Sequence, residues 1–180
     1  MSTLYVDNIY SKTGASQALS IDSSGRVDMN ASYVFDQWYL NANHTTDGDS
    51  DITAWSQVAW TGTGKVSGMS VSSGIFTFPQ TGLYKVTFQQ ATRSDASDNM
   101  NGQIHVTTDN STYTSVLSVA SGDSDSVNGT ASGSTFINVT NVSNVKVKFR
   151  ATSMDNASYV IGSSTTTRTN VMFERVAPAQ

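Results

Sequence analysis

Apolar and polar residues alternate over short stretches of this chain, and the alternation predicts β-strands. The clearest stretch is residues 74–88, which read GIFTFPQTGLYKVTF. Pro79 ends the first strand because proline has no N–H to offer a β-ladder, and Gly82 suits the following turn because it tolerates positive φ. Beyond the turn every second residue is apolar, so one face carries Tyr84, Val86 and Phe88. The segment predicts two antiparallel strands of an all-β sandwich.

The same pattern of strand and turn continues over residues 33–177. Apolar residues nowhere recur at i, i+3, i+4 and i+7 over three turns, so no helix is predicted. About ten strands, with a turn every ~8–12 residues, are typical of a sandwich or jelly roll. The further strands expected are Tyr33–Leu40, Ser56–Trp60, Val66–Val71, Gln103–Thr108, Tyr113–Ala120, Ser134–Val139, Asn144–Thr152, Ser158–Ile161 and Arg168–Val176. Three polar stretches are predicted to be long loops: Asn41–Ala54, Arg93–Met100 and Ser121–Gly133.

Residues 1–30 are predicted to form a separate small β module. The expected strands are Thr3–Tyr10, Ala18–Ile21 and Arg26–Met29, with a turn at Ser11–Gly14 and a hinge at Asn30–Ser32. Thirty residues are too few to bury a core of their own. We therefore expect them to pack against copies of themselves, the head or a partner. The predicted domains are the module, residues 1–30, and a jelly-roll head, residues 31–180.

Composition narrows the function classes. The acids are thirteen Asp and a single Glu, and Ser and Thr fill more than a quarter of the chain, which favours turns and polar strand faces over helices. The net charge of −4 argues against nucleic-acid binding, because phosphate contacts need a basic surface. With no cysteine there are no disulfides and no thiolate chemistry. The N-terminus does not read as a signal peptide, and no apolar run reaches the ~20 residues of a membrane span.

Motifs for catalysis or metal binding are incomplete. Gly62–Lys65 hints at a phosphate loop, but Ala59 and Val66 stand where that motif needs Gly and Ser or Thr, so a hairpin turn is expected. Asp47–Asp51 looks like the start of a calcium loop that lacks the required Gly and Glu further on; a looser calcium site remains an alternative. The two histidines, His44 and His105, have no spacing that suggests a metal centre or a triad. We expect no enzyme, no cofactor and no obligatory metal.

A basic ladder alternates along one predicted strand. Lys146, Lys148 and Arg150 share a face, whereas the residues between them are apolar. One interpretation is a solvated strand face that offsets the Asp-rich surface. The other is a contact with a neighbouring subunit or an anionic glycan.

Residues 74–88 also resemble the signature of jelly-roll heads of the complement and tumour-necrosis-factor superfamily, in which Phe-x-x-Pro precedes Gly-x-Tyr and an alternating strand. The closing stretch, Arg168–Val176, is similar to the family's final strand. Members form compact trimers that bind partners and usually catalyse nothing. The resemblance, with apolar residues on both faces of the last strand, predicts a homotrimer. The predicted interface residues are Tyr84, Val86, Phe88, Val171, Met172 and Phe173.

The beginning of the chain, MSTLYVDNIYSKTG followed by ALSIDSSGRV, looks like the opening of virion appendage proteins of tailed phages, especially those of marine bacteria (cyanophage-like). This resemblance implies a virion-attachment module. The expected function is a non-enzymatic, trimeric tail-fibre, knob or appendage protein for host adsorption, located on the virion surface after assembly in the host cytoplasm.

Its expected partners are itself, another virion protein bound through the module, and a host-surface glycan or protein. A trimeric capsid decoration or head-fibre protein is the alternative. Glycan depolymerases and lectin-like binding modules are alternatives of other classes.

Overall fold

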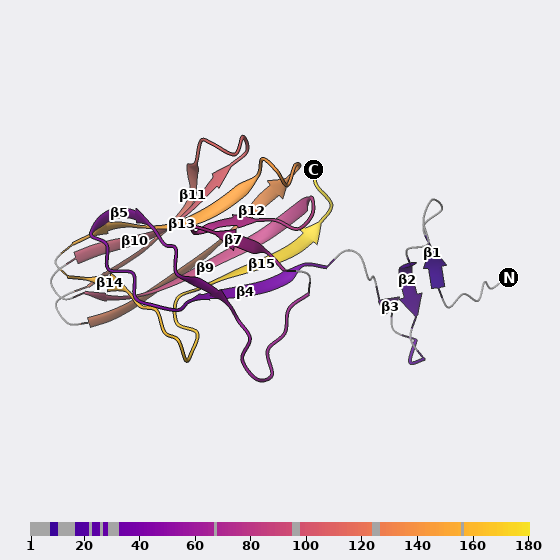
Figure 1. The fold of residues 1–180 in the computed structure, drawn as a ribbon, viewed down its shortest axis with the longest axis horizontal. Coiled ribbons are helices and arrows are strands. Elements are labelled where there is room, and N and C mark those ends of the chain that lie inside the picture. Colours follow the sequence, from indigo (N-terminus) through magenta and orange to yellow (C-terminus); the bar gives the residue numbers. More distant parts are fainter. Residues whose placement is uncertain are drawn as a thin grey trace. The chain divides into compact units, whose positions relative to one another are not determined.

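The computed structural model describes residues 8–10, 17–21, 23–25, 27–28, 33–66, 68–94, 98–123, 127–155 and 157–180. The chain divides into two compact units, Met1–Tyr33 and Val34–Gln180. The first unit contains a three-stranded antiparallel sheet in the order β1-β2-β3, formed by β1 (Asn8–Tyr10), β2 (Gln17–Ile21) and β3 (Val27–Asp28) (Figure 1). The predicted strand residues 3–7, the turn Ser11–Gly14 and the hinge residues 30–32 lie outside the described residues.

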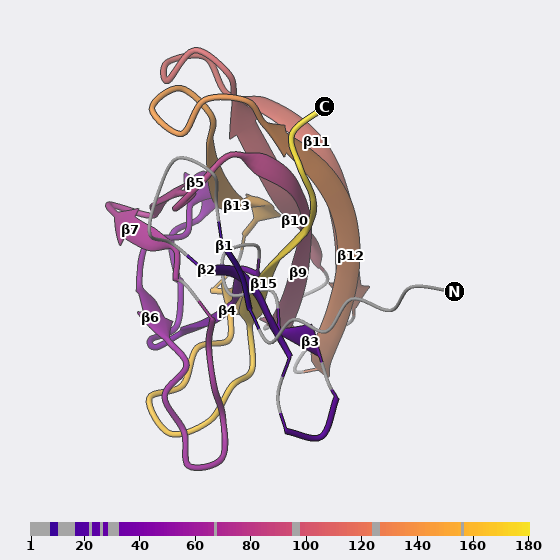
Figure 2. The same ribbon diagram turned by 90° about the vertical axis from the view of Figure 1, so that its right-hand side faces the viewer.

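The second unit is a sandwich of two antiparallel sheets (Figures 1 and 2), which confirms the predicted all-β jelly roll. One sheet, here the β10 sheet, has the order β11-β10-β13-β8-β7, and β5 also pairs with β13. Its strands are β5 (Gly48–Asp51), β7 (Ser70–Ser72), β8 (Ile75–Thr77), β10 (Asp98–Thr107), β11 (Thr114–Asp123) and β13 (Lys146–Met154). The other, the β9 sheet, has the order β12-β9-β15-β4-β6, and β14 also pairs with β9. Its strands are β4 (Phe35–Leu40), β6 (Trp55–Gln57), β9 (Gly82–Ser94), β12 (Val127–Val139), β14 (Tyr159–Val160) and β15 (Asn170–Ala177).

The core lies between the sheets and is centred on Phe76 of β8. Its ring centroid lies 5.6 Å from that of Phe149 in the same sheet and 5.1 Å from that of Phe173 in the β9 sheet. Trp38 and Trp55 approach Phe76 edge-on from β4 and β6. The alternation in the sequence therefore places the aromatic side chains of both sheets on the faces that meet in the core.

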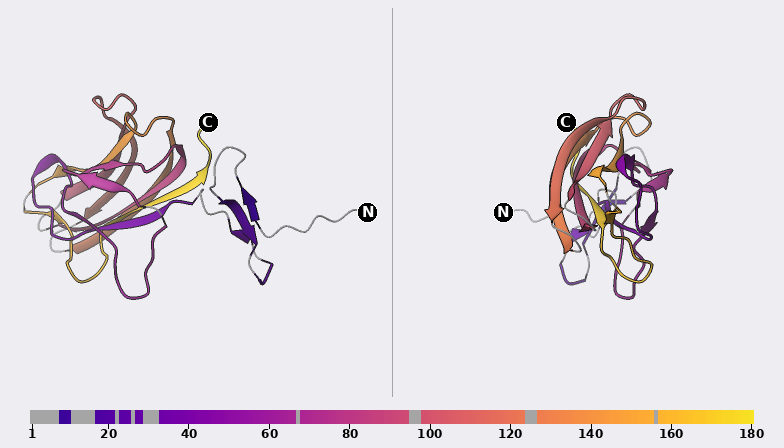
Figure 3. Two further views of the ribbon diagram at one scale, coloured as in Figure 1. Left: turned by 45° about the vertical axis from the view of Figure 1, so that its right-hand side comes forward. Right: turned by 90° about the vertical axis from the view of Figure 1, so that its left-hand side faces the viewer.

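The predicted long loops are shorter than expected. Asn41–Ala54 contains β5, which pairs with β13. Strand β9 continues to Ser94 and β10 begins at Asp98, so most of Arg93–Met100 is strand. Likewise β11 reaches Asp123 and β12 begins at Val127, and Figure 3 shows these two long strands along one side of the sandwich. Ser, Thr, Asn and Gly occupy both faces of these strand ends, so no hydrophobic period marked them as strands.

Candidate binding and assembly surfaces

The predicted interface residues separate onto two faces of the β9 sheet. Tyr84, Val86 and Phe88 of β9, with Val171 and Phe173 of β15, are fully buried within a single chain. Met172 is half-buried and points to the opposite face. A side chain that its own chain already covers has no area left for a neighbour. Five of the six predicted interface residues therefore lie in the interior of the single chain, and Met172 lies on the free face of the sheet.

Tyr84 illustrates why these residues belong to the core. Its ring centroid lies 4.7 Å from that of Phe78, and its hydroxyl donates a hydrogen bond to the Gln80 carbonyl oxygen at 2.9 Å. Burial raises the pKa of the Tyr84 phenol to about 12, although the Arg175 charge opposes the shift. Tyr84 thus closes the interior behind the Pro79–Gly82 turn, with its polar atom satisfied locally.

The free face of the β9 sheet is organised in rows across the strands. The first row runs Phe136–Lys85–Glu174–Phe35 from β12 to β4, and the second runs Ser134–Thr87–Met172–Gln37. The third is amide-rich: Ser132, Gln89, Asn170, Tyr39 and Ser56. The only charged side chains in these three rows are Lys85 and Glu174, which lie directly opposite each other. We call these three rows the assembly face.

The first row of the assembly face has an exposed aromatic side chain at each end, Phe136 on β12 and Phe35 on β4. Phe136 is 63% exposed and Phe35 is 42% exposed, and Val176, further along β15, is 46% exposed. Two more side chains near Phe35 are exposed. Tyr33 precedes Phe35 by two residues, and Val66 forms an isolated β-bridge with Phe35. Aromatic residues and Met with few charges are the composition that distinguishes the centre of a protein–protein interface.

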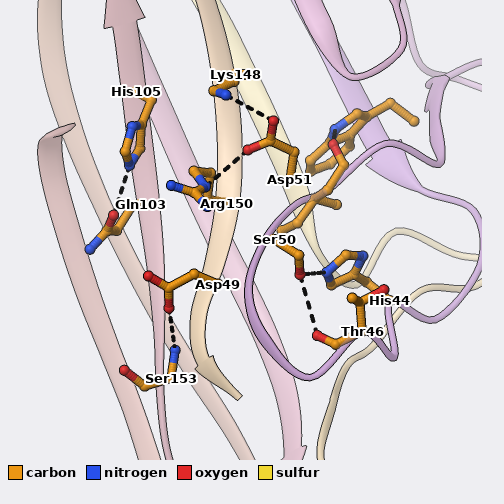
Figure 4. A network of polar contacts seen from close by, with 12 residues as sticks. His44, Thr46, Asp49, Ser50, Asp51, Gln103, His105, Lys148, Arg150 and Ser153 are labelled. Carbon is orange, nitrogen blue, oxygen red and sulfur yellow. Dashed lines mark hydrogen bonds and ion pairs between the residues drawn. The ribbon is translucent and has the colours of Figure 1, made fainter. Parts of the chain in front are cut away.

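The free face of the β10 sheet carries the basic ladder seen in the sequence (Figure 4). The Lys148 ammonium nitrogen lies 2.8 Å from Asp51 Oδ2, and Arg150 Nε lies 2.9 Å from Asp51 Oδ1. Lys146 Nζ donates to the Thr77 hydroxyl at 2.9 Å. Asp51 reaches the ladder because β5 pairs with β13 beside Arg150, and no short-range sequence signal predicts that pairing.

Both histidines have polar but uncharged hydrogen-bond partners. His105 Nε2 lies 2.7 Å from Gln103 Oε1, and His44 Nε2 lies 2.8 Å from the Ser50 hydroxyl (Figure 4). The pKa of His44 is lowered mainly by burial. The pKa of His105 is lowered first by burial and then by the Arg150 and Lys148 charges. The Ser50 hydroxyl in turn donates a hydrogen bond to the Thr46 carbonyl oxygen at 3.3 Å, so the His44 imidazole is the donor to Ser50 and does not act as a base towards it.

Two acids of the predicted calcium loop, Asp49 and Asp51, have different partners. Asp51 is held by the basic ladder, and Asp49 Oδ1 accepts the Ser153 N–H at 3.1 Å. Within the described residues, no three His, Cys, Asp or Glu side chains gather as metal ligands. In the same residues, no helix is long and apolar enough to cross a membrane.

Two sets of contacts made by residues of β4 are not predicted by the sequence. Asp36 is fully buried and accepts hydrogen bonds from the Trp38 indole at 2.8 Å, the Met69 N–H at 2.7 Å and the Gln57 amide at 2.9 Å. Tyr39 packs against Trp60, with ring centroids 5.0 Å apart. Asp36 joins three segments far apart in the sequence, and alternation alone does not distinguish such an acid from a solvated one.

Comparisons with known proteins identify the fold of the head. No family model and no curated protein matches the sequence. Eiger TNF of S. frugiperda superposes with a TM-score of 0.66 at 15% identity, covering 83% of this chain and 96% of that one. Murine APRIL superposes with a TM-score of 0.61 at 10% identity, covering 80% and 99%. The globular domain of zebrafish complement 1qA gives 0.54 at 14% identity, covering 83% and 99%. Identities this low show the fold alone: a jelly roll of the complement and TNF type.

Proposed function

We propose that this protein is a non-enzymatic, homotrimeric structural protein of a tailed-phage virion, a tail-fibre, knob or appendage component for host adsorption. The observation that carries the assembly part is the first two rows of the assembly face, where the exposed Phe136 and Phe35 and the half-buried Met172 stand with one Lys and one Glu. The jelly-roll fold supports the same reading, since the superfamily that the sequence resembles forms compact trimers.

The contact that we propose joins the assembly face of one copy to its neighbour. Phe136, Phe35 and Met172 supply the apolar area, and Ser132 and Gln89 of the third row supply polar groups at the rim. In a closed threefold ring the assembly face of every copy is occupied by a neighbouring copy. No assembly face stays free, so further copies cannot add to the ring as an open filament. The free face of the β10 sheet is then left for recognition.

The virion part rests on the N-terminal residues. Their similarity to the opening of phage appendage proteins fits a small β unit that has too few residues for a core and is completed by a partner on the particle. A head that binds without catalysing is in keeping with its jelly-roll fold.

Particles that lack this protein test the virion role. Poor adsorption to host cells with intact capsids is the expected result. Normal adsorption with weakened capsids would favour the decoration or head-fibre alternative, and sugar release from host polysaccharide by the purified protein would favour the depolymerase. If particles lacking the protein are unchanged in both respects, the virion proposal fails.

A further inference from the structure

A cationic cluster lies on the free face of the β10 sheet, in a protein whose net charge is −4. It consists of Lys146, Lys148 and Arg150, at alternate positions of β13; Figure 4 shows the latter two. Successive members are therefore about 6.6 Å apart along the strand. The side chains of Lys148 and Arg150 are 18% and 27% exposed, so both are within reach of a ligand at the surface.

The cluster is only partly neutralised. Asp51 is shared by Lys148 and Arg150, whereas Lys146 contacts the uncharged Thr77 hydroxyl. Arg150 Nε and Asp51 Oδ1 are close enough for an ion pair, but neither buried atom has a properly directed hydrogen bond within the described residues. The Asp51 carboxylate contacts two of the three cations, and the Asp49 carboxylate, which accepts the Ser153 N–H, lies nearby on β5.

Neighbouring side chains support binding at this surface. Tyr113 lies beneath the Lys148 ammonium, 4.6 Å from nitrogen to ring centroid, and so restricts the position of that charge. Gln103 and His105 lie beside the cluster on β10, where His105 pairs in register with Lys148. The pKa of His105 is lowered by burial and further by the Arg150 and Lys148 charges, while the Asp51 and Asp49 charges oppose the shift, so His105 lies within the electrostatic reach of the cluster. Amide and hydroxyl groups next to cations suit a ligand that carries both hydroxyls and acidic groups.

We propose that this cationic cluster binds an acidic polysaccharide through its carboxylate or sulfate groups, and that Asp51 competes with the ligand for Lys148 and Arg150. A row of cations at regular spacing fits repeated anionic groups along an extended polymer better than one isolated ion. Displaced by such a ligand, Asp51 can turn to solvent, because its side chain is 37% exposed. The site lies on the sheet opposite the assembly face, so the proposal holds for a monomeric or a trimeric head.

Titration calorimetry on the full-length protein at low salt tests the proposal. The probes are alginate as the carboxylated polymer, dextran sulfate as the sulfated one, neutral dextran and poly-glutamate. We expect at least one acidic polysaccharide to bind and dextran not to bind. Replacing two cations in the Lys148→Gln/Arg150→Gln variant should weaken binding by about tenfold or more, and Asp51→Asn should strengthen it several-fold, because charge-assisted contacts are lost or released.

Matched controls remove the same charges elsewhere. Lys65→Gln and Arg168→Gln change exposed loop residues outside the cluster and should leave the affinity unchanged. The proposal is overturned if neither acidic polysaccharide binds, if the controls weaken binding as much as the cluster variant, or if Asp51→Asn binds no more tightly. It also fails if poly-glutamate binds at the cluster and the polysaccharides do not, since the partner would then be an acidic protein. Melting curves check that each variant folds; if Asp51→Asn does not, the Lys148→Gln/Arg150→Gln variant decides alone.

Discussion

Replacing Met172 by Asp should separate the copies of this protein without unfolding them. Met172 lies in the second row of the assembly face, between Thr87 on β9 and Gln37 on β4. Because its side chain points away from the core, a carboxylate there can be solvated in the free protein. In the proposed trimer the same carboxylate would be buried without a partner.

The magnitude follows from burial. Covering a Met side chain contributes about 1.5–3 kcal/mol, and an unpaired carboxylate in a dry contact adds a further penalty of several kcal/mol. Counting only about 2 kcal/mol per copy, three copies lose about 6 kcal/mol per trimer, which weakens assembly by more than ~10⁴-fold. At micromolar concentration the variant should be monomeric.

Size-exclusion chromatography with light scattering measures the mass, and circular dichroism checks the fold. Phe136→Asp, at a position 63% exposed in the single chain, should give the same result, and it cannot be explained by core damage. Ser72→Asp adds the same charge on exposed β7 and should leave the mass unchanged. If Met172→Asp and Phe136→Asp keep the mass of the unmodified protein, the assembly face is not the interface. Tyr84→Asp, in contrast, should unfold the head because Tyr84 is wholly buried.

Three further predictions concern the stability of the head. Phe76→Ala should cost about 3–5 kcal/mol in the free energy of urea unfolding, because it empties the centre of the aromatic core; a loss under 1 kcal/mol would show that Phe76 is not central. Asp36→Ala should cost about 3 kcal/mol or more by leaving the Trp38, Gln57 and Met69 donors unpaired, and an unchanged melting temperature would contradict this. The folded chain raises the pKa of Tyr84 from 10.0 to about 12, so its contribution to stability is complete below pH 10 and is lost as pH rises towards 12. Between pH 10 and 12 the free energy of unfolding of Tyr84→Phe should therefore fall less than that of the unmodified protein. If the two proteins lose stability equally over this pH range, the raised pKa of Tyr84 is refuted.

The sequence predicts the β-sandwich, but it does not predict which face of each sheet is buried in the core. Residues 74–88 predict a strand, a turn and an alternating strand, and the structure has β8 and β9 there. Both faces of β15 carry apolar residues, so alternation could not tell which face meets the second sheet; that depends on the pairing of β15 with β9 and β4. The sequence therefore predicts an interface on residues that the structure buries in the core, such as Tyr84.

Polar interior positions were missed for a related reason. Gln90, Thr92 and Ser94 continue the inward face of β9 and are almost fully buried. Thr92 donates a hydrogen bond to Ser121 at 3.1 Å inside the sandwich. A hydrophobic pattern cannot identify buried positions of this kind, so it predicts loops where these strands end. The ion pairs of Asp51 could not be predicted from the sequence pattern either, because they join residues about a hundred positions apart.

The mass of the unmodified full-length protein in solution tests the central claim most directly. Light scattering at micromolar concentration should give about three times the chain mass of 19.2 kDa, since the account requires three copies closed through the assembly face. A mass of 19.2 kDa at that concentration would contradict the account, whatever ligand the free face of the β10 sheet binds.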